Sequence, residues 1–254
     1  MLCLAGYGDF AYFYDEFNGE ADYDALYSFI QERFSSHRLP GPIVADLGCG
    51  TGELTLRLAR DGYDLIAVDG SADMLAMLSA KLAEEGRQGV LLLEQDLTCL
   101  DLYGTIHGAV CTFDTLNHLG PLEAMGRAIE KVGLFMEKGG LFIFDVNTPY
   151  KHRCILGNET FTLEGEDAAC IWTNELQEEQ SRTRISIDIA YAGDPVHCRE
   201  CFYEYYCAPQ ELEAVCVKHG FRVLEVVDGE RFCAPGPESQ RLLFVAEKEI
   251  QCQS

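Results

Sequence analysis

The stretch that decides the fold is residues 43–59, IVADLGCGTGELTLRLA. Its first three residues form an apolar run typical of a buried strand. Leu54 and Leu58 lie four residues apart and indicate one face of a helix. The glycine-dense turn at 46–52 permits positive φ and lets a ligand approach the backbone, and a helix that begins there offers unpaired amide groups to an anion. The stretch predicts a strand-turn-helix unit of an α/β sheet that binds a nucleotide-type ligand.

The spacing of the glycines narrows the choice of ligand. A dinucleotide-binding turn has the pattern G-x-G-x-x-G, whereas Gly48, Gly50 and Gly52 follow Asp46 as G-x-G-x-G. This segment resembles motif I of the class I S-adenosylmethionine-dependent methyltransferases. The resemblance implies S-adenosyl-L-methionine as cofactor and S-adenosyl-L-homocysteine as product. A tight strand-to-helix turn without a ligand is the alternative.

The same resemblance implies the architecture. It is an α/β fold with a Rossmann-like, seven-stranded, mostly parallel sheet, helices on both faces and a small inserted antiparallel β-sheet. The length of 254 residues fits one large domain or one domain with an insertion. The final two strands of the sheet are expected at 221–227 and 241–246. We interpret Arg241 as a surface residue of this hairpin, and an arginine that reaches the acceptor is the alternative.

Composition excludes several classes of partner. The formal net charge is −23, which argues against nucleic acid, because binders of phosphate present a basic face. No apolar run approaches the ~18 residues that a membrane helix needs. The chain has 12 cysteines, and several stand inside apolar segments, as buried thiols do (Cys49, Cys111, Cys170 and Cys216). We therefore expect a cytoplasmic protein that binds neither nucleic acid nor membrane.

Acidic residues close three of the predicted strands. Segments 65–69 and 90–96 are apolar runs that end at Asp69 and Asp96, much as the first strand ends near Asp46. Ligands of open α/β sheets bind at the carboxyl edge, so these carboxylates are expected to meet there. The resemblance gives Asp69 the ribose hydroxyls, which a carboxylate can accept together. A helix-capping or turn aspartate is the alternative.

Further cofactor contacts follow from the resemblance. It implies that Asp96, the amide of Leu97 and Met74 meet the adenine, although a plain core position is the alternative for Met74. The glycines would pass the backbone around the amino-acid end of the cofactor. The expected cofactor-binding residues are Tyr7, Asp46, Gly48, Cys49, Gly50, Gly52, Asp69, Gly70, Met74, Asp96, Leu97 and Phe113.

Two residues are candidates for catalysis. Residues 114–119, DTLNHL, follow a predicted strand at 108–113 and resemble the loop of small-molecule N-methyltransferases that act on glycine or nucleotide-linked amino sugars. His118 would orient or deprotonate the acceptor, for which an imidazole that is neutral near pH 7 is suited; a histidine satisfied inside a loop is the alternative. Residues 7–17 resemble an aromatic segment that closes over cofactor and acceptor, which makes Tyr14 the second candidate.

The sequence pattern of residues 148–207 differs from that of the segments on either side. Short alternating segments separated by turn residues predict an antiparallel sheet. The resemblance implies that this insertion covers the acceptor site or forms a homodimer interface. We expect a lid segment and helix at 1–38, a cofactor-binding core at 39–147 and 208–254, and the inserted sheet at 148–207. Cys198 and Cys201 spell C-x-x-C, but no second pair is spaced for zinc, so no metal site is expected.

These observations favour an S-adenosylmethionine-dependent methyltransferase that acts on a nitrogen or oxygen of a small-molecule acceptor. Two alternatives remain open. One is a non-catalytic S-adenosylmethionine-binding module that acts through the inserted sheet. The other is a dinucleotide-dependent oxidoreductase, which the shortened glycine spacing and the acid after the third strand disfavour.

Overall fold

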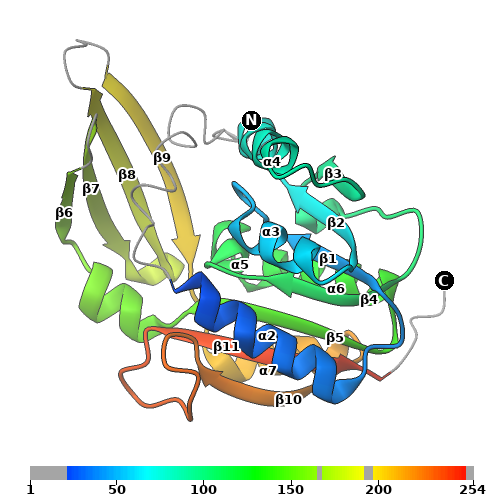
Figure 1. The fold of residues 1–254 in the computed structure, drawn as a ribbon. Helices are drawn as coiled ribbons and strands as arrows, with labels where there is room; N and C mark the ends of the chain where they lie inside the picture. The colour runs from blue at the N-terminus through cyan, green and yellow to red at the C-terminus, as the bar shows by residue number, and fades with distance from the viewer. Residues whose placement is uncertain (1–21, 165–167, 192–196, 250–254) are drawn as a thin grey trace.

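The computed structural model describes residues 22–164, 168–191 and 197–249. Its described strands form two sheets (Figure 1). The larger sheet has seven strands in the order β10-β11-β5-β4-β1-β2-β3. These strands are β1 (Ile43–Leu47), β2 (Asp64–Asp69), β3 (Val90–Glu94), β4 (Ile106–Cys111), β5 (Met136–Asn147), β10 (Phe221–Asp228) and β11 (Arg241–Lys248). Strand β11 pairs antiparallel with both of its neighbours, and the other pairs are parallel.

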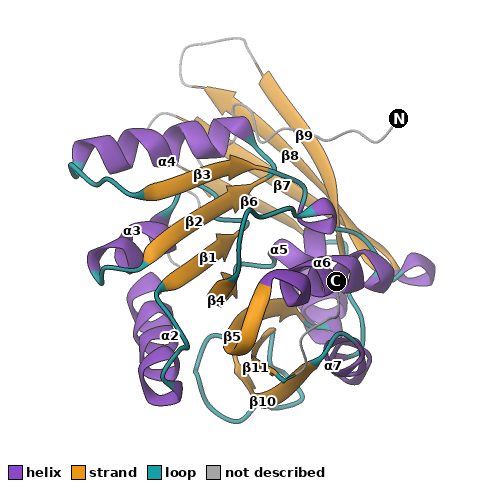
Figure 2. Ribbon diagram, turned by 90° about the vertical axis from the view of Figure 1, so that its right-hand side faces the viewer, coloured by secondary structure: helices purple, strands orange, loops and turns teal. Residues whose placement is uncertain are grey.

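Helices cover both faces of the larger sheet (Figure 2). One face packs against α6 and α7, whose apolar residues share a core cluster with β4 and β5. The other face packs against α2, α3 and α4. The helices are α2 (Tyr23–His37), α3 (Glu53–Arg60), α4 (Ala72–Glu84), α5 (Thr115–His118), α6 (Leu122–Phe135) and α7 (Pro209–Lys218), with shorter turns at η1 (Leu97–Cys99), η2 (Lys151–Leu156) and η3 (Glu178–Gln180). The predicted seven-stranded α/β architecture is confirmed.

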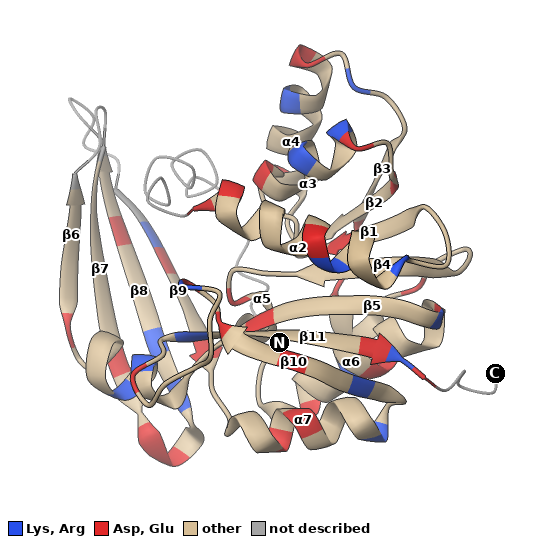
Figure 3. Cartoon of the chain, turned by 60° about the horizontal axis from the view of Figure 1, so that its bottom comes forward, with Lys and Arg blue, Asp and Glu red and all other residues tan. Residues whose placement is uncertain are grey.

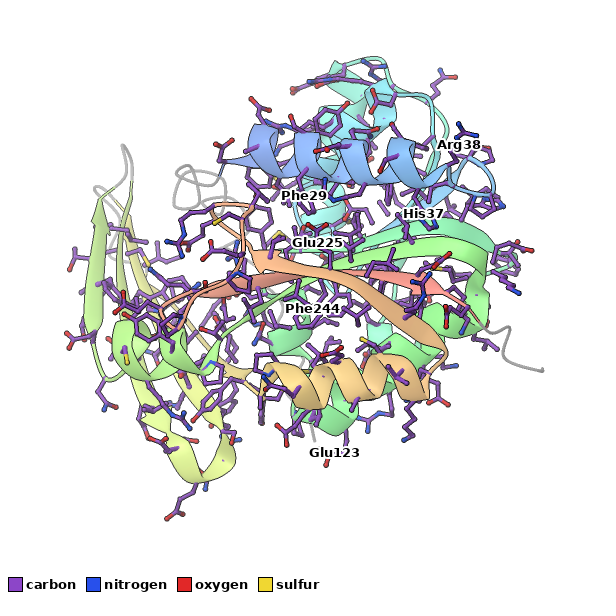
Figure 4. All side chains as sticks on the ribbon, turned by 90° about the horizontal axis from the view of Figure 1, so that it is seen from below. Phe29, His37, Arg38, Glu123, Glu225 and Phe244 are labelled. Atoms are coloured by element: carbon purple, nitrogen blue, oxygen red, sulfur yellow. The ribbon has the colours of Figure 1, made fainter. Side chains whose placement is uncertain are left out.

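Local sequence explains how these helices begin and pack. Ser71 is the N-cap of α4, and its hydroxyl accepts a hydrogen bond from the Met74 amide, which satisfies one of the amides that a helix start leaves open. Along α2, Phe29 points toward β10, where Glu225 lies (Figure 4). The Arg33 guanidinium donates to Glu225 over 2.8 Å and lies over the Phe29 ring. Helix α2 is therefore fixed on the sheet by an apolar stripe with one charged link.

The second sheet is the predicted insertion between β5 and α7. Its four antiparallel strands lie in the order β6-β7-β8-β9. They are β6 (Thr160–Glu164), β7 (Ala168–Gln177), β8 (Arg182–Tyr191) and β9 (His197–Tyr205). The π-helical turn η2 leads into them, and the sequence did not indicate it. The strands are longer than expected, since their alternation continues through charged residues on the outer face.

A buried amide side chain helps to tie the insertion to the core. Asn117 of α5 donates from Nδ2 to the carbonyl of Tyr205 over 2.7 Å and accepts from the amide of Asn147 over 2.9 Å. It therefore joins the end of β5 to the end of β9. The sheet is held where the chain leaves and re-enters the core.

The described part of the chain carries charged residues of both signs. Lys and Arg positions are interspersed with Asp and Glu over its helices and strands (Figure 3). Of the described helices, none combines the length and the apolar character needed to cross a membrane. The four cysteines expected to be buried are buried as free thiols.

Candidate functional site

The glycine turn after β1 has a backbone that only glycine adopts easily. Gly48, Gly50 and Gly52 have φ of 72°, 53° and 89°, in the left-handed region. A Cβ on Gly48 would stand 2.3 Å from the Thr115 side chain, and one on Gly52 would stand 2.1 Å from Leu78. A Cβ on Gly50 would meet nothing within 4 Å. Two glycines are thus required by close packing, while the third faces open space.

Asp69 fixes this turn to the end of β2. Its Oδ2 accepts from the Gly50 amide and its Oδ1 from the Ser71 amide, each over 2.8 Å. Burial raises the pKa of Asp69, against the effect of these backbone donors. Each carboxylate oxygen has two lone pairs, so both oxygens can accept further hydrogen bonds.

Asp46 has a structural partner. It is 2% exposed, and its Oδ2 accepts from the Thr55 hydroxyl of α3 over 2.6 Å. Burial raises the pKa of Asp46 to about 7. The carboxylate joins β1 to α3 and so holds the strand and helix on either side of the glycine turn.

A small cavity of about 40 Å³ lies against the turn. It brings together five of the residues that the sequence marked for the cofactor. These are Asp46, Gly48, Cys49, Gly50 and Phe113. Tyr23, Thr112 and Thr115 also border it, and no sequence signal had pointed to them.

For the residues expected near adenine, the prediction and the structure agree less closely. Strand β3 ends at Glu94, so the prediction that it runs to Asp96 was wrong by two residues. Asp96 is the N-cap of η1, and its Oδ1 accepts from the amide and hydroxyl of Thr98, both over 2.8 Å. Leu97 and Met74 are buried, and Gly70 is exposed. Tyr7 and Tyr14 lie outside the described residues.

His118 stands among carboxylates at the end of α5. Its Nε2 lies 3.4 Å from Asp114 Oδ2 and 3.9 Å from Glu204 Oε1. One ligand-type atom from each of these three residues lies within 4.8 Å of the others. Burial lowers the pKa of His118, but the hydrogen bond to Asp114 and the charges of Glu204 and Asp114 more than offset it, so the pKa is raised. His118 is 24% exposed and can be reached by a ligand.

Glu204 is a site residue that the sequence analysis missed. It comes from β9 of the inserted sheet and is 3% exposed. Asn147 donates from Nδ2 to its Oε2 over 3.0 Å, and Lys151 donates to Asn147 Oδ1 over 3.0 Å. Burial, together with the charge of Asp114, raises the pKa of Glu204. The inserted sheet therefore contributes a side chain to the His118 cluster.

Arg241 is also part of this region, and the expectation of a surface arginine was wrong. Its side chain is 17% exposed. Its Nη2 donates to Asp114 Oδ1 over 3.2 Å, and its guanidinium lies 5.0 Å from the centre of the Phe113 ring. Strand β11 lies between β10 and β5, so a residue at its start points over the carboxyl edge and away from bulk water.

Comparison with known proteins identifies the family. A family model described as a methyltransferase domain matches residues 44–140. A protein of Geobacillus sp. (strain WCH70), provisionally named a methyltransferase, is 32% identical over 251 residues, which are 95% of this chain and 99% of that protein. The chain belongs to the S-adenosylmethionine-dependent methyltransferases.

Solved structures show the same fold as this methyltransferase. An S-adenosylmethionine-dependent methyltransferase from Clostridium acetobutylicum ATCC 824 superposes with a TM-score of 0.86 at 24% identity, over 96% of this chain and 99% of that one. CalS10, described as an amino pentose methyltransferase from Micromonospora echinaspora and solved with S-adenosylmethionine, gives a TM-score of 0.73 at 20% identity, over 93% and 96%.

The residues present fit the cofactor of the family. Gly50 faces open space beside the cavity, and Asp69 offers two acceptor oxygens next to it. These residues would hold the amino-acid end and the ribose. When bound, S-adenosylmethionine supplies a methyl group on a positively charged sulfur.

A second histidine of this methyltransferase lies behind Glu204. His152 of η2 is 0% exposed, and its Nδ1 is 2.8 Å from the Thr183 hydroxyl. Its Nε2 lies 3.9 Å from Glu204 Oε2 and makes no hydrogen bond with the described residues. Burial, helped by Lys151, lowers the pKa of His152 to about 4. This imidazole is neutral at physiological pH.

Acid is expected to destabilise the wild-type protein more than the His152→Gln variant. The unfolded histidine titrates at about 6.5, above its folded value of about 4, so the unfolded state binds more protons and stability falls as pH is lowered through this window. For this group the loss between about pH 7 and about pH 5 is about 2 kcal/mol. Urea unfolding at both pH values measures it. His37→Gln, which changes a partly exposed histidine at the end of α2, should retain the loss, and an equal loss in His152→Gln would contradict the assignment.

Proposed function

We propose that this methyltransferase transfers the methyl group to an amine nitrogen of a small molecule. The observation that carries the proposal is the group of three acceptor atoms from Asp114, His118 and Glu204, all within 4.8 Å of one another. An ammonium nitrogen that donates three hydrogen bonds of about 2.9 Å separates its acceptors by about 4.7 Å. A protonated amine therefore matches the spacing of this group, and its charge is opposite to that of an ionised Asp114 or Glu204 carboxylate.

Neighbouring charges favour an ammonium over a divalent metal ion at the same atoms. The Arg241 guanidinium donates a hydrogen bond to Asp114. The Lys151 ammonium donates one to Asn147, which in turn donates to Glu204. Two positive groups this close repel a doubly charged ion more than a singly charged one. A neutral hydroxyl acceptor would gain less from the two carboxylates than an amine does.

The residues have distinct parts in the proposed reaction. An amine must lose a proton before its lone pair can attack a methyl carbon. His118 Nε2 accepts that proton when it is neutral, and Asp114 and Glu204 stabilise the imidazolium that results. The methylated product is again a cation and is held by the same carboxylates. Fixing the amine in line with the methyl group supplies the remainder of the rate enhancement.

The division of the chain supports a small acceptor. We assign residues 39–147 and 208–254 to the cofactor-binding core, 148–207 to an acceptor-covering insertion and 1–38 to a lid segment with its helix. Glu204 reaches the cluster from the insertion, so acceptor contacts come from both parts. The name of CalS10 gives an amino pentose as its acceptor class, which agrees with an amine here.

Glu204→Gln tests the acceptor site. Removing one negative charge is expected to raise KM for an amine acceptor about tenfold, or about 1.4 kcal/mol, because a charge-assisted hydrogen bond is lost. Methyl transfer from labelled cofactor to a panel of amines and their matched alcohols is the measurement. Glu178→Gln, an exposed glutamate after β7, is the matched control and should behave as wild type.

The same assay separates the alternatives. Activity on amines should survive treatment with EDTA. Methylation of alcohols alone, or activity that disappears with EDTA and returns with a divalent metal, would overturn the proposal. Binding of S-adenosylhomocysteine without transfer to any acceptor would favour the non-catalytic module.

A further inference from the structure

The chain makes an unusual turn between β4 and α5. Phe113 and Asp114 have φ of 55° and 56°, so two consecutive residues with side chains adopt the left-handed conformation. This conformation brings the Cβ of a non-glycine residue close to the following carbonyl oxygen and is therefore strained. It persists only where the surroundings impose it, which is common at functional sites.

A carboxylate near the end of β5 holds this turn. Asp145 accepts from the Phe113 amide at Oδ2 over 2.8 Å and from the Asp114 amide at Oδ1 over 2.7 Å. It is 2% exposed. Strands β4 and β5 are paired neighbours, so this side chain meets the backbone that leaves β4.

Arg241 completes the arrangement from the other side of β5. Its Nη2 donates to Asp114 Oδ1, and its Nε lies 3.8 Å from Asp145 Oδ2. The guanidinium therefore faces both Asp145, which holds the turn, and Asp114, the second residue of the turn. Burial raises the pKa of Asp145, while the Arg241 charge opposes this.

The turn sends successive side chains to two different places. Phe113 borders the cavity beside the glycine turn. Asp114 begins α5 and lies 3.4 Å from His118 Nε2. A change in these two φ angles would move the wall of the cofactor cavity and the partner of His118 together.

We propose that Asp145 is a positioning residue, which holds the Phe113–Asp114 turn so that Asp114 orients His118 toward the acceptor while Phe113 borders the cofactor cavity. The catalytic consequence rests on the proposed function, and the structural one does not. Among the described residues, the titratable groups that act on His118 are Asp114 at the N-cap of α5, Glu204 from β9, Asp69 from β2 and His152 from η2. Of these, Asp114 is the one that Asp145 places.

Asp145→Asn tests the proposal because it keeps the shape and removes one acceptor oxygen. The amide nitrogen cannot accept, so one of the two backbone amides loses its partner. Hydrogen exchange at the Phe113 and Asp114 amides is expected to accelerate at least tenfold. The His118 titration, followed by NMR without ligands, is expected to shift toward lower pH, and kcat to fall about 10–100-fold with the acid limb of the pH–rate profile displaced. Arg241→Lys, which keeps the charge and loses the planar fork, should shift the titration in the same direction if Asp145→Asn does not fold.

Asp228→Asn is the matched control. Asp228 is also a buried aspartate at the carboxyl end of a strand, and it accepts from the amides of Glu230 and Arg231. The Asp228→Asn variant should be less stable than the wild type and should leave the His118 titration unchanged. The proposal is overturned if Asp145→Asn lowers stability as Asp228→Asn does and leaves both titration and pH–rate profile in place. If the wild type methylates no amine while Asp145→Asn still shifts the titration, the proposed function fails and the positioning role stands.

Discussion

Replacing His118 by asparagine is expected to lower kcat/KM for an amine acceptor by a factor of about 10²–10⁴, the usual contribution of a positioned general base. The imidazole lies between two carboxylates, which would stabilise the imidazolium that proton transfer forms. Asparagine keeps a hydrogen-bonding group at the site but cannot take up a proton. The measurement is steady-state methyl transfer with a saturating cofactor concentration. Cofactor affinity, determined by calorimetry, should change little.

The pH dependence gives this prediction a second readout. The pKa of His118 is raised above its ordinary value of about 6.5, and only the neutral form accepts a proton. The wild-type rate should therefore fall on the acid side with a midpoint above that value, and the variant should lose this limb. His37→Gln is the control, since His37 lies at the end of α2 remote from the inserted sheet (Figure 4). An unchanged rate in His118→Asn, or an acid limb that survives in it, would remove His118 from catalysis.

Asp69→Ala is expected to weaken cofactor binding about a hundredfold, or about 2.7 kcal/mol. Two effects combine. The carboxylate would no longer accept hydrogen bonds from the ribose, each of which is worth about 1.5–3 kcal/mol when charge-assisted. The amides of Gly50 and Ser71 would also lose their acceptor, so the glycine turn would be less well ordered before binding. Calorimetry with S-adenosylhomocysteine measures the change.

A nearby aspartate offers the control for Asp69. Asp73 lies in the first turn of α4 and is exposed, so Asp73→Ala should bind the cofactor as wild type does. Thermal unfolding of Asp69→Ala without ligand separates a loss of affinity from a loss of folding. Affinity within threefold of wild type would show that Asp69 holds only the turn.

The sequence predicted those parts of the site that depend on short-range pattern. The glycine turn and the acid at the end of β2 each follow from spacing within one strand-turn-helix unit. The contact between Asp69 and the Gly50 amide also follows, because parallel neighbours end at one edge of the sheet. The boundary of β3 was wrong because the Asp96 side chain caps η1 and ends the strand early.

The missed residues depend on contacts between distant segments. Glu204 alternates with Tyr203 and Tyr205 on β9, and a period of two does not reveal which face is turned inward. Arg241 was predicted to be a surface residue, because its burial depends on the position of β11 beside β5. Asp145 could have been found, since it stands near the end of a predicted strand and the rule applied to Asp46, Asp69 and Asp96 applies equally to it. The left-handed pair Phe113 and Asp114 has no local signal.

The link that Asn117 makes between the ends of β5 and β9 has an evolutionary consequence. Because the insertion leaves and re-enters the core at neighbouring points, its strands can change in sequence and length while the path of the core chain stays the same. Chimaeras that exchange the inserted sheet between relatives can therefore be joined at Asn147 and Tyr205.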